Sequence, residues 1–237
     1  MGYLFDGTTS NIRAGSAASL NNMEPFTWSA WVFPETFGES NVGVIFQKGS
    51  SLQSGQMGFS LASNGALRFS RDYATTDIML LSSTAAITLN VWQHVCLTWT
   101  GSNAATSARM YVNGNEVTYS VLTNGVGAKN SDAAVFLNVG NRGGFDNTFD
   151  GQITEVACWG SAILSLDQIN LLASSRIKRL PLQLTSSTGS LRLYYPLDNY
   201  PDGAAVTGSA MDLSINGNHG IPQGTLVARA EEVLSYA

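Results

Sequence analysis

The chain of 237 residues is poor in charge and in cysteine. Charged residues make up 12% of the sequence, about half of the roughly 25% that is usual in globular domains. Ser, Thr, Asn, Gln and Gly must therefore cover much of the surface. The two cysteines, Cys96 and Cys158, lie in apolar, strand-like runs, which favours buried free thiols over a disulfide scaffold. A single bridge between packed strands stays open as the alternative.

The chain also lacks a basic stripe and a long apolar run. Its net charge is -5, and its one basic cluster, Arg176, Lys178 and Arg179, follows a predicted helix, whose C-terminus cations complement. We therefore expect no nucleic-acid partner. No apolar run reaches the roughly 20 residues of a membrane helix, so we expect no membrane insertion. The first residues do not resemble a secretory signal, which favours folding in a cytoplasm; a secreted chain whose signal was removed is the alternative.

What the chain does contain is short apolar runs separated by Asn-Gly and Gly-rich turns, which is typical of antiparallel strands. In residues 57–71, apolar side chains alternate with small or polar ones on both sides of Asn64-Gly65. This pattern predicts a β-hairpin with a two-residue type I′ turn, because Asn and Gly tolerate positive φ. Residues 109–117 predict a second hairpin around Asn113-Gly114.

Six further strands and one helix are predicted. The strands span residues 26–33, 44–48, 92–100, 135–139, 152–159 and 191–197. They do not alternate regularly with helices, which disfavours a parallel sheet. Ser165 and Gln168 form a capping box ahead of apolar residues at helical spacing, so we expect a short helix from Leu166 to Ser174. Residues 227–236 form either a short helix or an extended arm.

Five stretches, in this order along the chain, carry a family resemblance: Phe5-Asp6-Gly7, FTWSAWV at 26–32, WQHVCLTW at 92–99, MYVNG at 110–114 and FDGQITEV at 149–156. Together they resemble the concanavalin A-like lectin/glucanase superfamily, in its laminin G-like and pentraxin-like branch. The resemblance implies an all-β fold, a two-sheet antiparallel jelly-roll sandwich with one short helix. Residues 1–175 would form its core.

Residues 176–237 form a C-terminal extension, a connector followed by strands. Two segments within it, at 194–198 and 212–220, resemble the stretch that usually opens such a domain. Its strands either complete the same sandwich or contact a neighbouring subunit, since exchange of strands between identical chains is a low-cost route to oligomers.

The sequence offers no recognisable catalytic motif. It lacks the Glu-x-Asp-x-x-Glu strand of related glucanases, which aims paired carboxylates into one cleft, and a Gly-x-Ser-x-Gly elbow. The nearest acid groupings lie in or beside loops: Glu35/Glu39, Asp72/Asp77 and Asp146/Asp150. His94 lies in mid-strand, where a partly buried, hydrogen-bonded histidine is expected, and His219 lies in a turn. We therefore expect that the chain has no enzymatic activity.

The resemblance also implies an optional calcium site, because this branch often holds the ion with loop oxygens and an acid of the strand at 149–156. Asp6, Asp150 and Glu155 are the candidate ligands, with Thr154 where the family has an aspartate. The alternative is that the aspartates bond their own backbone in turns. No other cofactor is expected.

A sugar site is expected in the glycine-rich loop that follows the strand at 135–139, since binding residues concentrate in loops. The candidate ligand-binding residues are Asn141, Arg142, Phe145, Asp146 and Asn147. A plain connector is the alternative. The five tryptophans lie in predicted strands and are expected in the core.

Two hypotheses for function follow. The first is a non-catalytic structural or interaction protein of a phage virion surface, a capsid decoration or tail-fibre component made in the host cytoplasm. Its partners would be other virion proteins or identical subunits, with cell-surface glycans as adhesion targets. The second is an extracellular, secreted or cell-surface carbohydrate-binding module assisted by calcium. Fold alone does not decide between them.

Overall fold

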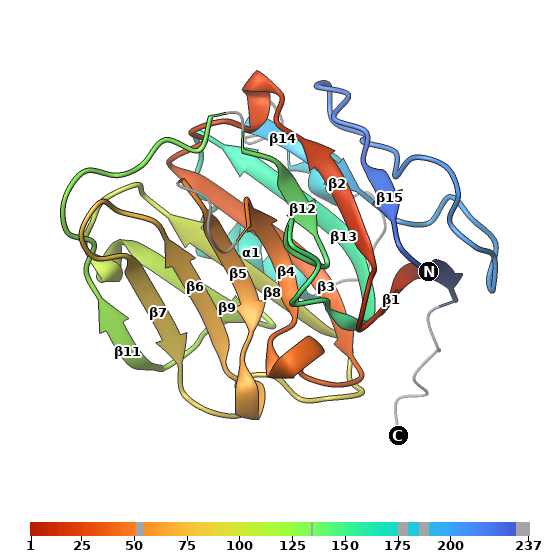
Figure 1. Ribbon diagram of the computed structural model, residues 1–237, viewed down its shortest axis with the longest axis horizontal. Helices are drawn as coiled ribbons and strands as arrows, with labels where there is room; N and C mark the ends of the chain where they lie inside the picture. The colour runs from red at the N-terminus through yellow and green to blue at the C-terminus, as the bar shows by residue number, and fades with distance from the viewer. Residues whose placement is uncertain (51–54, 134, 175–179, 185–189, 231–237) are drawn as a thin grey trace.

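Alternation of inward apolar and outward polar residues along the strands produces two antiparallel sheets that pack face to face (Figure 1). The computed structural model describes residues 1–50, 55–133, 135–174, 180–184 and 190–230. The predicted all-β jelly-roll sandwich is confirmed. The basic cluster expected at 176–179 lies outside the described residues.

Sheet A is organised around its longest strand, β13. Its strands run in the order β10 (Asn115–Glu116), β9 (Ala108–Val112), β8 (Gln93–Trp99), β3 (Phe26–Pro34), β13 (Asp150–Gly160), β1 (Gly2–Asp6) and β16 (Leu226–Arg229). The first part of β13 pairs with β1, and its later part pairs with β14 (Leu191–Tyr195). The two pairings meet at Glu155, whose φ of 52° marks an irregularity in the strand.

Sheet B is a continuous antiparallel sheet. Its order is β11 (Tyr119–Thr123), β7 (Ile78–Ser82), β6 (Leu67–Arg71), β5 (Met57–Leu61), β4 (Val44–Lys48), β12 (Leu137–Val139), β2 (Asn11–Gly15) and β15 (Ile221–Gln223). The C-terminal region thus supplies strands to both sheets within one chain: β14 and β16 to sheet A, and β15 beside β2 in sheet B (Figure 1). Of the segment predicted at 227–236, residues 227–229 belong to strand β16, and residues 231–236 lie outside the described residues.

The core between the sheets is aromatic. Trp28 stacks between Phe26 and Phe46, with ring centroids 4.7 and 5.2 Å away. Four of the five tryptophans are buried, whereas Trp31 is half-buried and faces away from this core. Cys96 and Cys158 are both buried and free. The expectation of buried free thiols is therefore confirmed.

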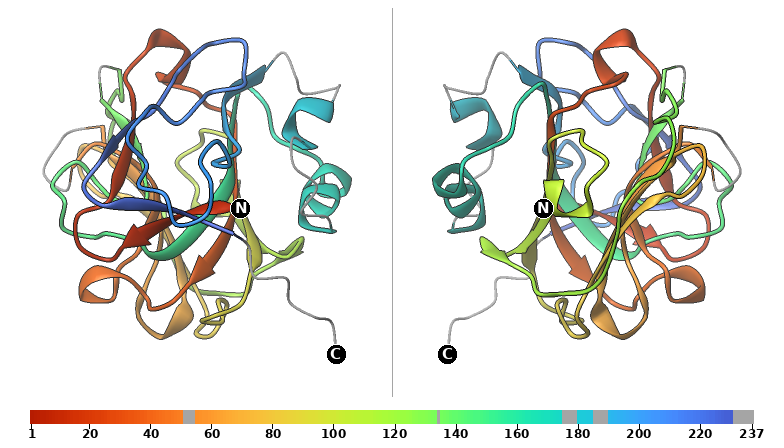
Figure 2. Two further views of the ribbon diagram at one scale, coloured as in Figure 1. Left: turned by 90° about the vertical axis from the view of Figure 1, so that its right-hand side faces the viewer. Right: turned by 90° about the vertical axis from the view of Figure 1, so that its left-hand side faces the viewer.

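Helix α1 (Leu166–Ser174) has the predicted bounds and the predicted capping box. The Ser165 amide donates to Gln168 Oε1 over 2.9 Å, and the Gln168 amide donates to Ser165 Oγ over 3.3 Å. The helix lies on the outside of sheet A (Figure 2). The described residues also contain short 3-10 segments: η1 (Ala18–Leu20), η2 (Glu39–Asn41), η3 (Ser63–Gly65), η4 (Ala105–Ser107) and η5 (Leu180–Gln183). Among the described residues, no helix is long and apolar enough to cross a bilayer.

The two predicted hairpins form, but one turn differs from its prediction. Val112 pairs with Asn115, so Asn113-Gly114 is a two-residue turn with positive φ at both positions, as type I′ requires. The β5–β6 turn is longer, because Leu61 pairs with Leu67 and leaves residues 63–65 in the loop. The two-residue prediction was wrong, since it would set Phe59 opposite Ser70. Directly opposed residues share a face, and a buried Phe59 pairs with Phe69 instead.

Candidate functional site

Among the described residues, helical segments cover one half of the outer face of sheet A. There α1 and η5 bury an apolar layer that includes Trp159, Tyr194 and Cys96 from the sheet. Trp31 marks the boundary, since its indole Nε1 donates to the Leu172 carbonyl of α1 over 3.3 Å. The remaining half of the face, over β16, β1, β13 and β3, carries a hollow of about 630 Å³, which we call the outer groove.

Strand register builds the floor of the outer groove. Leu4 pairs with Gln152, and Gln152 pairs with Phe33, so the three side chains form one row across three strands. Leu4 alternates with Tyr3 and Phe5, which point into the core, and it therefore points outward. The row continues to Trp92, whose ring centroid lies 5.6 Å from that of Phe33. An apolar and aromatic floor of this kind suits the flat face of a sugar ring.

The floor contains one buried polar atom that points to a ligand. Gln152 is 8% exposed, and within the described part of the chain its Oε1 has no hydrogen-bond partner. An unpaired buried polar group costs about 1–3 kcal/mol. A donor from a ligand that enters the groove would remove this cost.

The rim of the outer groove is polar and exposed. It is formed by Glu35, Asn90, Asp202 and Arg229. Backbone hydrogen bonds hold the rim in place: the Glu35 amide donates to Asp150 O over 2.9 Å, and the Asn90 amide donates to Pro34 O over 2.8 Å. The Asp202 carboxylate accepts the Ala230 amide over 2.8 Å. The groove thus offers carboxylate, amide and guanidinium groups above an apolar floor.

The loop predicted to bind sugar is internally bonded. Asn141 is fully buried, donates to Thr148 Oγ1, and accepts the amides of Arg142 and Asn147 at 2.8 and 3.3 Å. Asn147 is also buried. These two amides therefore stabilise the loop rather than face solvent.

The other three residues of that loop stay at the surface. Arg142 forms a two-pronged ion pair with Asp146, with 2.8 Å between Nη2 and Oδ2. Phe145 is 37% exposed. The loop therefore presents an aromatic ring and a paired arginine, and it contributes nothing to the outer groove.

The three predicted calcium ligands do not meet at one point. Asp6 and Asp150 are directly opposed across β1 and β13. Glu155 lies further along β13, is buried, and accepts the Tyr194 hydroxyl over 2.6 Å. Among the described residues, no group of three or more His, Cys, Asp or Glu side chains could hold a metal ion.

Asp6 is occupied by its own turn. Partial burial would raise the pKa of Asp6, but the Thr9 hydroxyl and the amides of Thr8, Thr9 and Ser10 donate to its carboxylate and hold the pKa well below its usual value. Asp150 accepts the Thr36 hydroxyl over 2.7 Å. Asp6 therefore behaves as the turn residue of the alternative interpretation, whereas Asp150 lies in β13 and bonds a side chain distant in sequence.

The two histidines have structural surroundings. His94 is buried, and its Nε2 lies 2.8 Å from Ser29 Oγ. Burial lowers the pKa of His94 to about 3, so the ring stays neutral near pH 7. His219 lies in a turn, where its Nδ1 accepts the Asp212 amide over 3.0 Å. Neither histidine lines the outer groove.

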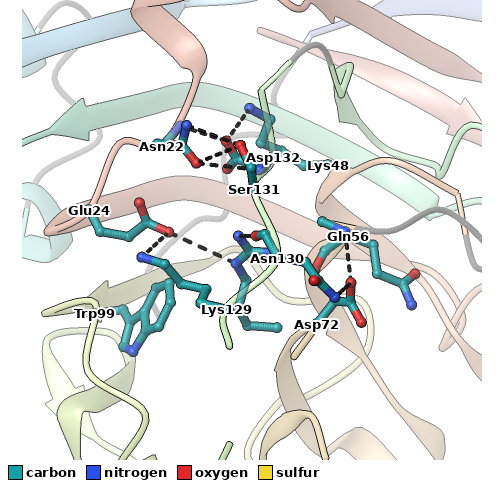
Figure 3. Close-up of polar contacts among 12 residues, drawn as sticks. Asn22, Glu24, Lys48, Gln56, Asp72, Trp99, Lys129, Asn130, Ser131 and Asp132 are labelled. Atoms are coloured by element: carbon teal, nitrogen blue, oxygen red, sulfur yellow. Dashed lines mark hydrogen bonds and ion pairs between the residues drawn. The ribbon is translucent and has the colours of Figure 1, made fainter. Parts of the chain in front are cut away.

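A second polar cluster, partly buried, links the segment at 129–132 to Glu24 and Lys48 (Figure 3). Lys48 Nζ lies 3.3 Å from Asp132 Oδ1, and both side chains are fully buried. Glu24 lies 3.2 Å from Lys129 and 3.9 Å from Arg71. Since positive and negative groups are paired, we interpret this cluster as an anchor for the segment that contains Lys129 and Asp132, and not as a ligand site.

The sequence did not single out the outer groove, because its residues come from separate segments that only strand register brings together. One signal was available. In the strand at 26–34, Phe26, Trp28, Ala30 and Val32 all face the core. Phe33 falls at an outward position by alternation, and an aromatic residue there indicates a covered or ligand-binding surface.

The comparison with protein families agrees with the two-sheet sandwich fold. Residues 6–170 match the family model described as the concanavalin A-like lectin/glucanases superfamily. The comparison with curated protein sequences finds no match.

Solved structures share the fold at low identity. A protein from Bacteroides ovatus, proposed to bind carbohydrate, is 17% identical with a TM-score of 0.60, over 98% of this chain and 61% of that one. Tailspike protein 2 of the Escherichia coli bacteriophage CAB120 is 11% identical with a TM-score of 0.57, over 84% of this chain and 27% of that one. A heptameric SAP-like pentraxin from Limulus polyphemus is 19% identical with a TM-score of 0.50, over 72% and 80%.

Proposed function

Because this chain belongs to the concanavalin A-like lectin/glucanase superfamily, we propose that it is a non-catalytic glycan-binding module on a phage virion surface. Its targets are cell-surface glycans, and its protein partners are other virion proteins or identical subunits. The observation that carries the proposal is the outer groove, where Gln152 lies between Leu4 and Phe33 and its buried amide oxygen has no hydrogen-bond partner among the described residues.

Similar structures support both parts of this proposal. The Bacteroides ovatus protein, proposed to bind carbohydrate, matches nearly the whole chain, including the C-terminal strands. The tailspike protein contains a region of similar fold within a virion component. Since a shared fold does not fix function, the groove supplies the chemical basis and the tailspike supports the location.

Exposure of the acids in the groove supports binding rather than hydrolysis. Glu35 and Asp202 are both exposed. A glycosidase keeps its general acid protonated by placing it in an apolar, desolvated pocket. An exposed carboxylate lacks that environment and serves as a hydrogen-bond acceptor for sugar hydroxyls.

An extracellular carbohydrate-binding module of a cell is the second candidate, favoured by the match with the Bacteroides ovatus protein. Both candidates predict that the purified chain binds a glycan array. We expect Phe33→Ala to lower that binding about tenfold or more, while Phe145→Ala leaves it unchanged. Loss of binding in Phe145→Ala alone would move the site to the 141–147 loop.

Location is tested separately. Mass spectrometry of purified phage particles is expected to detect the chain at a stoichiometry set by the particle's symmetry. Its presence in the secreted or cell-surface fraction of a culture without particles would favour the second candidate.

A further inference from the structure

We propose that the outer groove takes an uncharged saccharide and binds it without calcium. This inference rests on the proposed function, because it names the ligand class for the same site. It follows from the balance of hydrogen-bond acceptors, donors and charges that the groove presents.

The groove is rich in acceptors. The carboxylates of Glu35 and Asp202 accept hydrogen bonds only. The Gln152 atom that lacks a partner in the described part of the chain is its acceptor oxygen. A neutral sugar matches this pattern because each of its hydroxyl groups can donate. Adjacent hydroxyls can also bridge an amide oxygen and a carboxylate, which gives a geometric selection among sugars.

The charge balance of the groove disfavours acidic sugars. Two carboxylates, Glu35 and Asp202, stand against one guanidinium, Arg229. A sialic or uronic acid would add a third negative charge within the same hollow, where like charges closer than about 8 Å repel each other with little screening at physiological salt. Arg229 can pair with only part of that excess.

We expect the groove to bind its ligand without a bridging calcium ion. A bound calcium ion needs six to eight oxygen ligands, several of them carboxylates. Among the described residues, no group of three or more His, Cys, Asp or Glu side chains could hold a metal ion. The groove instead offers an organic ligand its hydrogen bonds directly, from side chains on strands and rim loops.

Isothermal titration calorimetry tests this inference with a neutral oligosaccharide, N-acetyllactosamine, with its sialylated form, and with any further neutral glycan that the array selects. We expect the neutral ligand to bind equally in calcium and in chelator, and the sialylated form to bind at least about tenfold more weakly. Gln152→Met, which keeps the side-chain length, is expected to weaken neutral binding about tenfold.

The charge argument has its own variant and control. Glu35→Gln with Asp202→Asn should bring the sialylated ligand to within about threefold of the neutral one. Glu116→Gln with Asp167→Asn removes the same charge from exposed acids outside the groove and should leave the preference unchanged. Equal effects of the two double variants would show net charge, not the groove, as the cause.

The remaining outcomes distinguish a failure of the inferred ligand class from a failure of the proposed glycan-binding function. If no glycan binds the wild-type chain, the proposed function fails. If glycans bind but the sialylated form is preferred, or if chelator abolishes binding, only the ligand class is wrong. If Arg142→Ala abolishes binding while Gln152→Met does not, the site is the loop. Release of new reducing ends from the oligosaccharide would overturn the non-catalytic assignment.

Discussion

At the scale of single residues, Gly140 shows that a loop glycine can serve the core. Gly140 opens the glycine-rich loop in which the sequence predicts a sugar site. In the structure a Cβ at Gly140 would lie 1.9 Å from Phe5 Cε1, and its φ is +81°. Phe5 is fully buried. The missing side chain therefore makes room for a core ring, which composition alone could not reveal.

This placement predicts a large effect of Gly140→Ala. The variant combines the cost of positive φ, about 1 kcal/mol, with displacement of a buried ring, about 1–3 kcal/mol. We expect a total loss of about 2–4 kcal/mol in the free energy of unfolding, measured with urea. Gly203→Ala is the matched control, since Gly203 has a φ of +77° and no atom within 4 Å of the added Cβ. Equal losses in the two variants would refute the steric contact with Phe5.

At the scale of elements, the alternation of apolar and polar residues predicted many of the strands but not the outer groove that they form. Strand β4 and helix α1 have the predicted bounds, because each has a complete local pattern. Strands β2, β7, β11 and β15 were not predicted. Of these, β2, β11 and β15 pair with strands distant in sequence, so local patterns carry little information about them. The outer groove failed to emerge for the same reason, as Leu4, Gln152 and Phe33 become neighbours only through register.

The buried pair Lys48–Asp132 predicts how a long connection is held to the sandwich. Lys48→Met leaves the Asp132 carboxylate buried without its cation, and such a loss costs about 3–5 kcal/mol. Urea unfolding is the measurement. Arg109→Met is the control, because it removes the cation of the exposed pair Arg109–Glu116, which is worth under about 1 kcal/mol.

A second substitution tests the physical cause. Adding Asp132→Asn to Lys48→Met removes the unpaired buried charge of the Asp132 carboxylate. We expect the double variant to recover part of the lost stability. A Lys48→Met variant no less stable than Arg109→Met would show that the pair does not anchor the segment.

At the scale of the whole molecule, the folded sandwich extends further along the chain than the region that matches the family model. The family match stops at residue 170, but β14, β15 and β16 lie beyond it and pair with β13, β2 and β1. Tyr194 and Tyr195 of β14 are fully buried. The sequence left open whether this region packs in the same chain or in a neighbour, because complementary strand edges look alike in either case.

A truncation follows from this arrangement. In residues 1–174 alone, β1, β2 and the later part of β13 each keep one edge unpaired, because their partners β16, β15 and β14 are missing. Unpaired strand edges promote association. Loss of the buried β14 side chains removes about 1.5–3 kcal/mol for each large apolar residue. We expect this fragment to aggregate or to lose its cooperative thermal transition. Co-expression with residues 190–230 is expected to restore a soluble complex by strand pairing.

A fragment that melts cooperatively at the temperature of the full chain would show that the sandwich is complete without its C-terminal strands. The outer groove would then need another source for Asp202 and Arg229, since both lie in the removed part.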